Sequence, residues 1–159
     1  MSKEMLATIN PGALGTGLYK ERLLSLPLHE KGVAIYRNKS IVPNAAITFN
    51  SLVNLAQTAN QGGKVGAMLE RSFYYSAGHL FGLGGQFFDD EGLPTFDAED
   101  YRYSLAWLEL LRAFENAGTA EYRSDNDVRM FNENRVGFII ESTSQMYNLA
   151  GELDPLNLA

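Results

Sequence analysis

Cysteine is absent from this 159-residue chain. Its absence excludes disulfide bonds, thiolate nucleophiles and metal sites with cysteine ligands. Long apolar runs are also missing, because no stretch approaches the roughly 20 residues that a membrane-spanning helix requires. The sequence contains no zinc motif, phosphate loop or nucleophile elbow. We therefore predict no insertion into a bilayer, no metal and no cofactor.

Basic residues are outnumbered by acidic ones. Lysine and arginine total 13 against 19 aspartates and glutamates, so the formal net charge is −6. Because the charges are dispersed and form no basic patch, the chain is not expected to bind nucleic acid. Apolar material is plentiful, at 45% hydrophobic and 11% aromatic residues, which suffices for the core of one domain.

Composition divides the chain into two regions. Residues 1–22 are interrupted by proline and glycine, which predicts a flexible lead-in or an artificial junction. They lack the apolar stretch of a secretion signal, so a signal for export, if the natural protein has one, lies outside this chain. Residues 23–159 predict a single α/β lobe.

Short apolar runs alternate with helical patterns in this lobe. Extended segments are expected at residues 23–28, 32–36, 65–69 and 135–141. Helices are expected at residues 49–60, from Ser72 to about Leu83, and at residues 98–116, 125–132 and about 144–152. Thr48, Ser72 and Asp97 are the expected N-caps. The continuously apolar run at residues 136–140 indicates an interior strand, so we predict an α/β fold in which helices cover a small mixed sheet.

The order of five motifs resembles a known family. A proline segment at residues 25–28 precedes a strand that ends in the Tyr-Arg-Asn-Lys of residues 36–39. Thr48 and Phe49 follow at a helix start, then Gly-Gly-Gln-Phe-Phe at residues 84–88, and a Phe-containing segment before a strand at residues 131–140. Together these motifs resemble the C-terminal lobe of the extracellular solute-binding proteins that serve ABC importers, including maltose- and oligosaccharide-binding proteins. The resemblance implies one lobe of a periplasmic-binding-protein type II-like fold.

Some features depart from that family. Asn134 stands where the family commonly has glycine, and Ser144 falls near a position that often carries a tryptophan stacked on ligand. A full member is over twice this length. The resemblance therefore implies an excised or truncated lobe whose N-terminal lobe is missing.

The resemblance also implies a binding site. In the family, solute sits in the cleft between lobes, where aromatic faces and polar groups suit a sugar. Tyr74 matches a position at which an aromatic residue touches ligand, and residues 141–144, at the end of the strand expected at 135–141, match a second loop that faces the cleft. The candidate ligand contacts are Tyr74, Tyr75, Glu70, Glu141, Ser142, Thr143 and Ser144. The implied function is that of an extracytoplasmic receptor, periplasmic or at the cell surface, that delivers a solute, expected to be a sugar, to a membrane permease.

Other interpretations of these residues stay open. The tyrosine pair is also consistent with core packing, and residues 142–144 with a simple N-cap cluster. Glu70 and Arg71 are also consistent with a solvated ion pair, and His79 is expected to be a satisfied core histidine. Trp107 is expected to pack within the fold or against another domain.

Two other classes of function are compatible with the sequence. A stand-alone interaction module could use the exposed cleft face to associate with itself. A hydrolase would use Glu70 or Glu141 as its catalytic carboxylate. A separate group of acids, at residues 89–91, lies in an expected turn and matches neither a glycosidase pair nor an EF-hand loop. We therefore predict a binding protein and not an enzyme.

Overall fold

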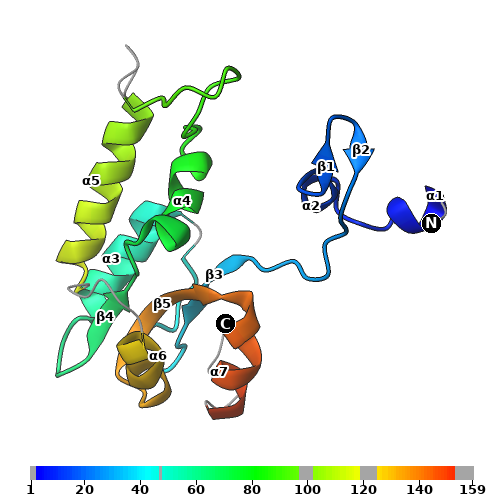
Figure 1. Cartoon of the computed structure of the whole chain (residues 1–159). Helices are drawn as coiled ribbons and strands as arrows, with labels where there is room; N and C mark the ends of the chain where they lie inside the picture. Colours follow the sequence, from blue (N-terminus) through cyan, green and yellow to red (C-terminus); the bar gives the residue numbers. More distant parts are fainter. Residues whose placement is uncertain (1–2, 47, 97–101, 119–124, 153–159) are drawn as a thin grey trace. The chain divides into compact units, whose positions relative to one another are not determined.

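The computed structural model describes residues 3–46, 48–96, 102–118 and 125–152. Two compact units divide the chain, Met1–Gly32 and Val33–Ala159 (Figure 1). The sequence instead predicts a boundary after residue 22. The expected N-cap Asp97 lies outside the described residues.

The first unit contains regular structure where a flexible segment is expected from the sequence. Its elements are α1 (Lys3–Leu6), α2 (Pro11–Gly15), β1 (Leu18–Tyr19) and β2 (Arg22–Leu23). The Asn10 side chain caps α2 by accepting a hydrogen bond from Gly12 N at 2.8 Å. Lys20 and Glu21 connect the two antiparallel strands with positive φ angles of 46° and 63°. Such a tight two-residue turn normally contains glycine or asparagine, so its sequence signal is weak.

The second unit is built on a three-stranded mixed sheet in the order β3-β5-β4. The strands are β3 (Val33–Arg37), β4 (Val65–Met68) and β5 (Val136–Ser142). β5 pairs antiparallel with β3 and parallel with β4. The predicted interior strand and mixed sheet are therefore confirmed. Of the extended piece expected at residues 23–28, only Leu23 lies in a strand.

Helices account for most of the other described residues of the second unit. They are α3 (Phe49–Ala59), α4 (Phe73–Gly82), α5 (Arg102–Asn116), α6 (Asp125–Asn132) and α7 (Met146–Glu152), with the 3-10 helix η1 (Thr143–Gln145) before α7. Thr48 caps α3 as predicted: its Oγ1 accepts from Ser51 N at 3.1 Å, and Ser51 Oγ accepts from Thr48 N at 3.0 Å. Ser72 precedes α4, but its side chain makes no capping hydrogen bond within the described residues.

Successive side chains of each strand point to opposite faces of the sheet, and both faces are covered by apolar side chains. On one face, Ala67, Phe138 and Ile140 belong to a core with Leu52 of α3 and Phe114 of α5. The opposite face packs side chains of β4 and β5 against α6 and α7, through Met68, Ile139, Phe131 and Leu149. The second unit is thus a layer of strands with helices on both sides, which confirms the predicted α/β class (Figure 1).

An acidic turn follows α4 in the second unit. Asp89 Oδ1 accepts hydrogen bonds from Glu91 N at 2.9 Å and Leu93 N at 2.8 Å, so the predicted tight turn is confirmed. The residues on either side form only an isolated bridge between Phe88 and Pro94.

A glycine sets the approach of α3 to the sheet. A Cβ atom added at Gly66 of β4 would collide with the backbone carbonyl oxygen of Ala56 in α3. Backbone atoms cannot swing aside as the end of a flexible side chain can, so the helix would have to move off the strand.

We expect Gly66→Ala to lower the free energy of unfolding by at least about 2 kcal/mol, because the added methyl group separates α3 from β4. Urea denaturation measures this loss. Gly78→Ala is the matched control: its Cβ meets open space within α4, and alanine should stabilise the helix by about 0.5–1 kcal/mol. Equal stabilities of Gly66→Ala and the unaltered chain would contradict the close approach.

Candidate functional site

The predicted site residues gather at one edge of the sheet. β4 and β5 are parallel, with Met68 opposite Ile139, so their carboxyl ends reach the same edge. Glu70 follows β4, and Glu141 and Ser142 end β5. In open α/β sheets, ligands commonly bind beyond the carboxyl ends of strands.

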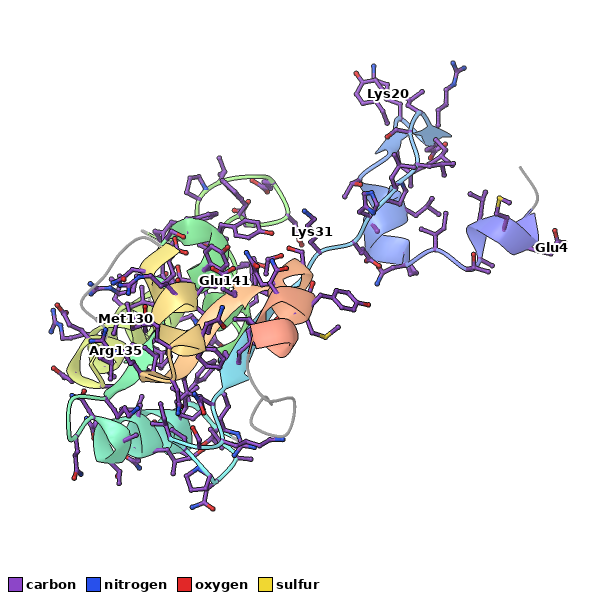
Figure 2. All side chains as sticks on the ribbon, turned by 90° about the horizontal axis from the view of Figure 1, so that it is seen from below. Glu4, Lys20, Lys31, Met130, Arg135 and Glu141 are labelled. Carbon is purple, nitrogen blue, oxygen red and sulfur yellow. The ribbon has the colours of Figure 1, made fainter. Side chains whose placement is uncertain are left out.

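A hydrogen bond joins two of the predicted residues. The Tyr75 hydroxyl in the first turn of α4 donates to Glu141 Oε2 at 3.2 Å. The same oxygen accepts from Ser142 N at 2.9 Å. Glu141 is only 5% exposed, so this carboxyl group is buried and held in place rather than presented to solvent; Figure 2 labels it on the ribbon.

Tyr36 belongs to this network and was missed by the sequence analysis. Its hydroxyl donates to the Ser142 carbonyl oxygen at 3.2 Å, which ties β3 to the end of β5. Burial, followed by the negative charge of Glu141, raises the pKa of Tyr36. The same two causes, with the hydrogen bond to Glu141, raise the pKa of Tyr75 to about 12. Both hydroxyls therefore stay protonated and act as donors near neutral pH.

Tyr74 differs from its neighbour because its side chain is 60% exposed. Its ring meets the ring of Tyr75 edge to face, with centroids 5.1 Å apart. Tyr75 is therefore a packing residue, because it lies against the core that contains Phe138 and Phe114. Tyr74 is not part of that core. Tyr74 presents an aromatic surface of the kind on which a sugar ring can stack.

The serine cluster combines a structural and an exposed part. Ser142 Oγ lies 2.9 Å from Ser144 Oγ and accepts from Ser144 N at 3.3 Å, so the predicted N-cap role of Ser142 is confirmed for η1. Thr143 and Ser144 are exposed. This loop can offer hydroxyl groups to a bound polar molecule.

Asp127 of α6 is a further titratable group at the site that the sequence analysis did not single out. It is 4% exposed, and its Oδ1 accepts from Val128 N at 2.7 Å. Burial raises its pKa to about 7, the Val128 hydrogen bond opposes this, and the charges of Glu141 and Glu70 raise it further. Asp127 lies four residues before the buried Phe131, so both residues are on the inward face of α6. This spacing is the sequence pattern from which the burial of Asp127 could have been predicted.

The alternative of a solvated ion pair between Glu70 and Arg71 does not appear among the ion pairs of the described residues. Arg71 Nη1 instead lies 3.3 Å from Glu115 Oε2. Glu70 Oε2 is buried and has no hydrogen-bond partner among the described residues.

Two further residues, His79 and Trp107, were predicted to pack within the fold. His79 is buried against Phe49 and Phe114, as expected, but its Nε2 has no hydrogen-bond partner among the described residues, so the expectation of a satisfied histidine is wrong. Burial lowers its pKa. Trp107 packs on Phe87 and donates from Nε1 to Ser76 O at 3.0 Å, which confirms a packing role.

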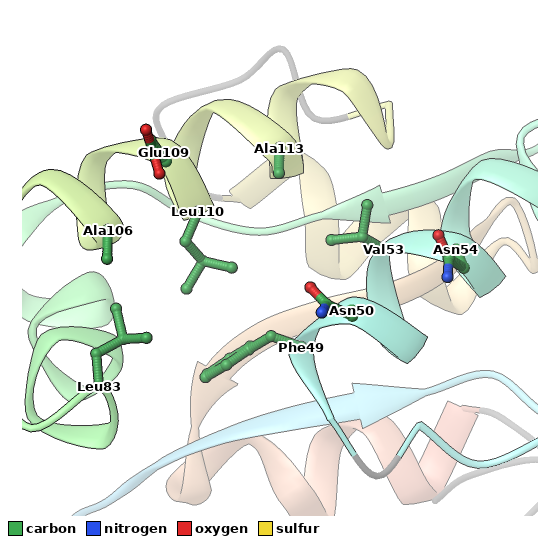
Figure 3. Close-up of a pocket in the computed structure, with 9 residues that line it drawn as sticks. All are labelled: Phe49, Asn50, Val53, Asn54, Leu83, Ala106, Glu109, Leu110 and Ala113. Carbon is green, nitrogen blue, oxygen red and sulfur yellow. The ribbon is translucent and has the colours of Figure 1, made fainter.

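A separate pocket of about 490 Å³ lies between α3 and α5. Figure 3 shows Phe49 and Val53 of α3, Leu110 of α5 and Leu83 after α4 around it. None of the predicted ligand contacts lines this pocket. Tyr74 and the 142–144 loop are thus a surface rather than part of this cavity.

Neither a metal site nor a membrane-spanning helix occurs among the described residues. Within the described ranges, no group of three histidine, cysteine, aspartate or glutamate side chains could hold a metal ion. The helices in the same ranges are too short or too polar to cross a bilayer.

Comparison with known proteins shows the family. The model of the bacterial extracellular solute-binding protein family matches residues 3–157, so the chain belongs to this family. A comparison with curated proteins gives no match.

Two solved structures share the fold. The GacH receptor of Streptomyces glaucescens, solved unliganded and with acarbose or an acarbose homolog, has a TM-score of 0.79 and 14% identity over 94% of this chain. The maltotriose-binding protein of Thermus thermophilus, solved with maltotriose, has a TM-score of 0.73 and 19% identity over 96% of this chain. This chain spans 42% and 43% of their respective lengths. The fold is therefore that of a solute-binding protein of the maltose-binding type.

We expect Asp127→Asn to change the pH dependence of stability. The folded pKa of Asp127, about 7, exceeds its ordinary value of 3.8. The folded chain therefore binds an extra proton between these values, and this group makes stability fall as pH rises from about 4 to about 7. Asparagine does not titrate and can still accept from Val128 N, so the variant should gain on the unaltered chain across this window, by up to about 4 kcal/mol.

Urea denaturation between about pH 5 and about pH 8 measures this difference. Asp90→Asn, in the exposed turn after α4, is the control and should follow the unaltered chain. A constant difference between Asp127→Asn and the unaltered chain would refute the buried titration.

Proposed function

We propose that this chain is the ligand-binding lobe, by resemblance the C-terminal one, of an extracytoplasmic receptor for a carbohydrate. The observation that carries the proposal is the exposed ring of Tyr74, which contacts the ring of Tyr75, whose hydroxyl group is hydrogen-bonded to Glu141 near the end of β5. An aromatic face suits the apolar face of a pyranose, and neighbouring hydroxyl groups suit its hydroxyl ring.

The class of solute is supported by the related structures. Both solved relatives were crystallised with oligosaccharides or an analogue, acarbose or maltotriose. The candidate surface here offers aromatic and uncharged hydroxyl groups at its exposed positions, while the carboxyl group of Glu141 is buried. These features favour a neutral, hydroxyl-rich ligand over a charged one.

The mechanism we propose is closure of two lobes over the solute. An N-terminal lobe would supply the opposite wall of the cleft, and the closed receptor would then deliver the solute to a membrane permease of an ABC importer. No cofactor enters this mechanism. Catalysis by Glu141 is disfavoured because its Oε2 already accepts two hydrogen bonds inside the fold.

A second candidate function is supported by exposed apolar side chains. Phe73 and Tyr74 are each 60% exposed at the start of α4, and Phe81 of the same helix is 55% exposed. Such a surface favours association with another protein or with a second copy of the chain. Light scattering separates the two candidates, since an apparent mass that does not rise with concentration would count against self-association.

Isothermal titration with maltotriose tests the carbohydrate proposal. One wall of a cleft should bind weakly, with a dissociation constant on the order of 1 mM or weaker, because half of the contacts are supplied by the other lobe. Tyr74→Ala should abolish the remaining heat, whereas Tyr147→Ala, an exposed tyrosine of α7, should not.

Two outcomes of this titration would contradict the proposal. Submicromolar affinity of this chain alone would contradict the half-site. Unchanged weak binding by Tyr74→Ala would contradict the role of the Tyr74 ring.

A further inference from the structure

The outer face of α4 lacks the charged residues that a surface helix normally carries. None of the ten residues of Phe73–Gly82 is Asp, Glu, Lys or Arg, and the histidine of this helix, His79, is buried. The exposed side nevertheless presents large aromatic side chains, with Phe73 and Tyr74 60% exposed and Phe81 55% exposed. A helix without a charged or strongly polar face is normally covered on all sides, so the outer face of α4 is expected to have a partner.

The exposed rings are held in place before any partner binds. Phe73 and Phe81 both contact the ring of the buried Phe87, with centroids 4.4 Å and 5.3 Å apart. Tyr74 meets the ring of Tyr75 edge to face at 5.1 Å. Side chains that are already ordered lose little conformational entropy when they are covered, which favours association through this face.

The outer face of α4 has the same residue pattern in both chain directions. Positions 74, 77, 78 and 81 have the i, i+3, i+4, i+7 spacing of one helix face and carry Tyr, Ala, Gly and Phe. Two small residues thus lie between two aromatic ones, symmetrically about the midpoint of 77 and 78. A Cβ atom added at Gly78 meets open space, so the middle of this face is accessible to a second helix.

We propose that α4 pairs with α4 of a second copy of this chain, antiparallel and crossing between Ala77 and Gly78. A two-fold axis at this point places Tyr74 of each copy opposite Phe81 of the other. The small residues at the crossing let the two helix backbones approach closely. Such a contact requires a self-complementary surface, which the symmetric pattern supplies, and a helix without charged residues sets no like charges of its own against each other.

The size of this face predicts a weak dimer. The three exposed aromatic side chains of each copy would bury roughly 500–900 Å² over the two copies, given their exposed fractions. Stable interfaces bury about 1,200–2,000 Å² in total, so we expect a dissociation constant on the order of 100 µM. The proposal rests on self-association, the second candidate function, and specifies its partner and contact residues.

Dimerisation and solute binding would compete for one side chain. A Tyr74 ring that lies against Phe81 of a second copy is covered and cannot stack on a sugar. If the carbohydrate proposal holds, maltotriose therefore binds the monomer and dissociates the dimer by mass action.

Sedimentation and light scattering of the whole chain between about 10 µM and about 1 mM test the pairing. The apparent mass should rise from one copy toward two. Phe81→Ala should weaken the dimer at least about tenfold. Gly78→Arg should abolish it, because it places a charge at the crossing, and arginine is a good helix former at a position with open space. Leu108→Ala, 56% exposed on α5, and Gln57→Arg, exposed on α3, are the matched controls and should associate like the unaltered chain.

Introduced cysteines test the position of the two-fold axis. The natural sequence has no cysteine, so a disulfide dimer can join only the introduced residues. Gly78→Cys, beside the axis, should form a disulfide dimer when oxidised with diamide, because the two thiols lie close together. Gln57→Cys, on the exposed side of α3, should remain monomeric under the same conditions.

The outcomes separate this proposal from the functions proposed above. A mass that stays at one copy up to about 1 mM would overturn both the pairing and self-association. Equal association of Phe81→Ala, Gly78→Arg and the unaltered chain, or equal cross-linking of Gly78→Cys and Gln57→Cys, would overturn the α4 pairing alone. A dimer that depends on Phe81 in a chain that does not bind maltotriose would support the pairing and reject the carbohydrate proposal.

Discussion

The structure of the second unit depends on β5. This strand is hydrogen-bonded on both edges, antiparallel to β3 and parallel to β4, and its first six residues are buried. Its side chains supply both apolar cores, Phe138 and Ile140 on one face and Ile139 on the other. A strand with no free edge and no solvent-facing side has one available register, because a slip by one residue would exchange the two cores.

The packing that fixes β5 also fixes Glu141 and Ser142 at its end, which are residues of the candidate site. Glu141 is buried by the same packing, and a buried carboxylate must be hydrogen-bonded to be tolerated. Tyr75 and the amide of Ser142 meet that need, which links α4 to the 142–144 loop. Tyr74, one residue away, does not share in this network and keeps its ring exposed. The two neighbouring tyrosines thus differ: Tyr75 is half-buried and holds Glu141 by a hydrogen bond, whereas the ring of Tyr74 is exposed.

Much of the second unit could be predicted from the sequence because its signals are local. The apolar run at residues 136–140 predicted an interior strand, and Thr48 predicted a helix start that the capping box confirms. The resemblance to solute-binding proteins led to the family that the comparison shows. It also led to the candidate surface, which stays a prediction.

Two of the missed features depend on contacts between distant residues, and the third is a local turn with a weak sequence signal. The bond from Tyr36 to Ser142 joins residues 106 positions apart, and no local pattern indicates it. Asp127 is a polar residue of a short helix, and its burial follows from the packing of α6 in the folded chain. The hairpin at Lys20 and Glu21 lacks the glycine or asparagine that normally marks such a turn, so composition predicted a flexible segment there.

The central claim is that solute meets this chain at the edge where β4 and β5 end. Mapping backbone amide shifts during a titration with maltotriose tests it most directly, because weak binding is sufficient for that measurement. We predict that the shifts concentrate at residues 70–75 and 141–144. Shifts confined to the pocket between α3 and α5, around Asn50 and Glu109, would contradict the account.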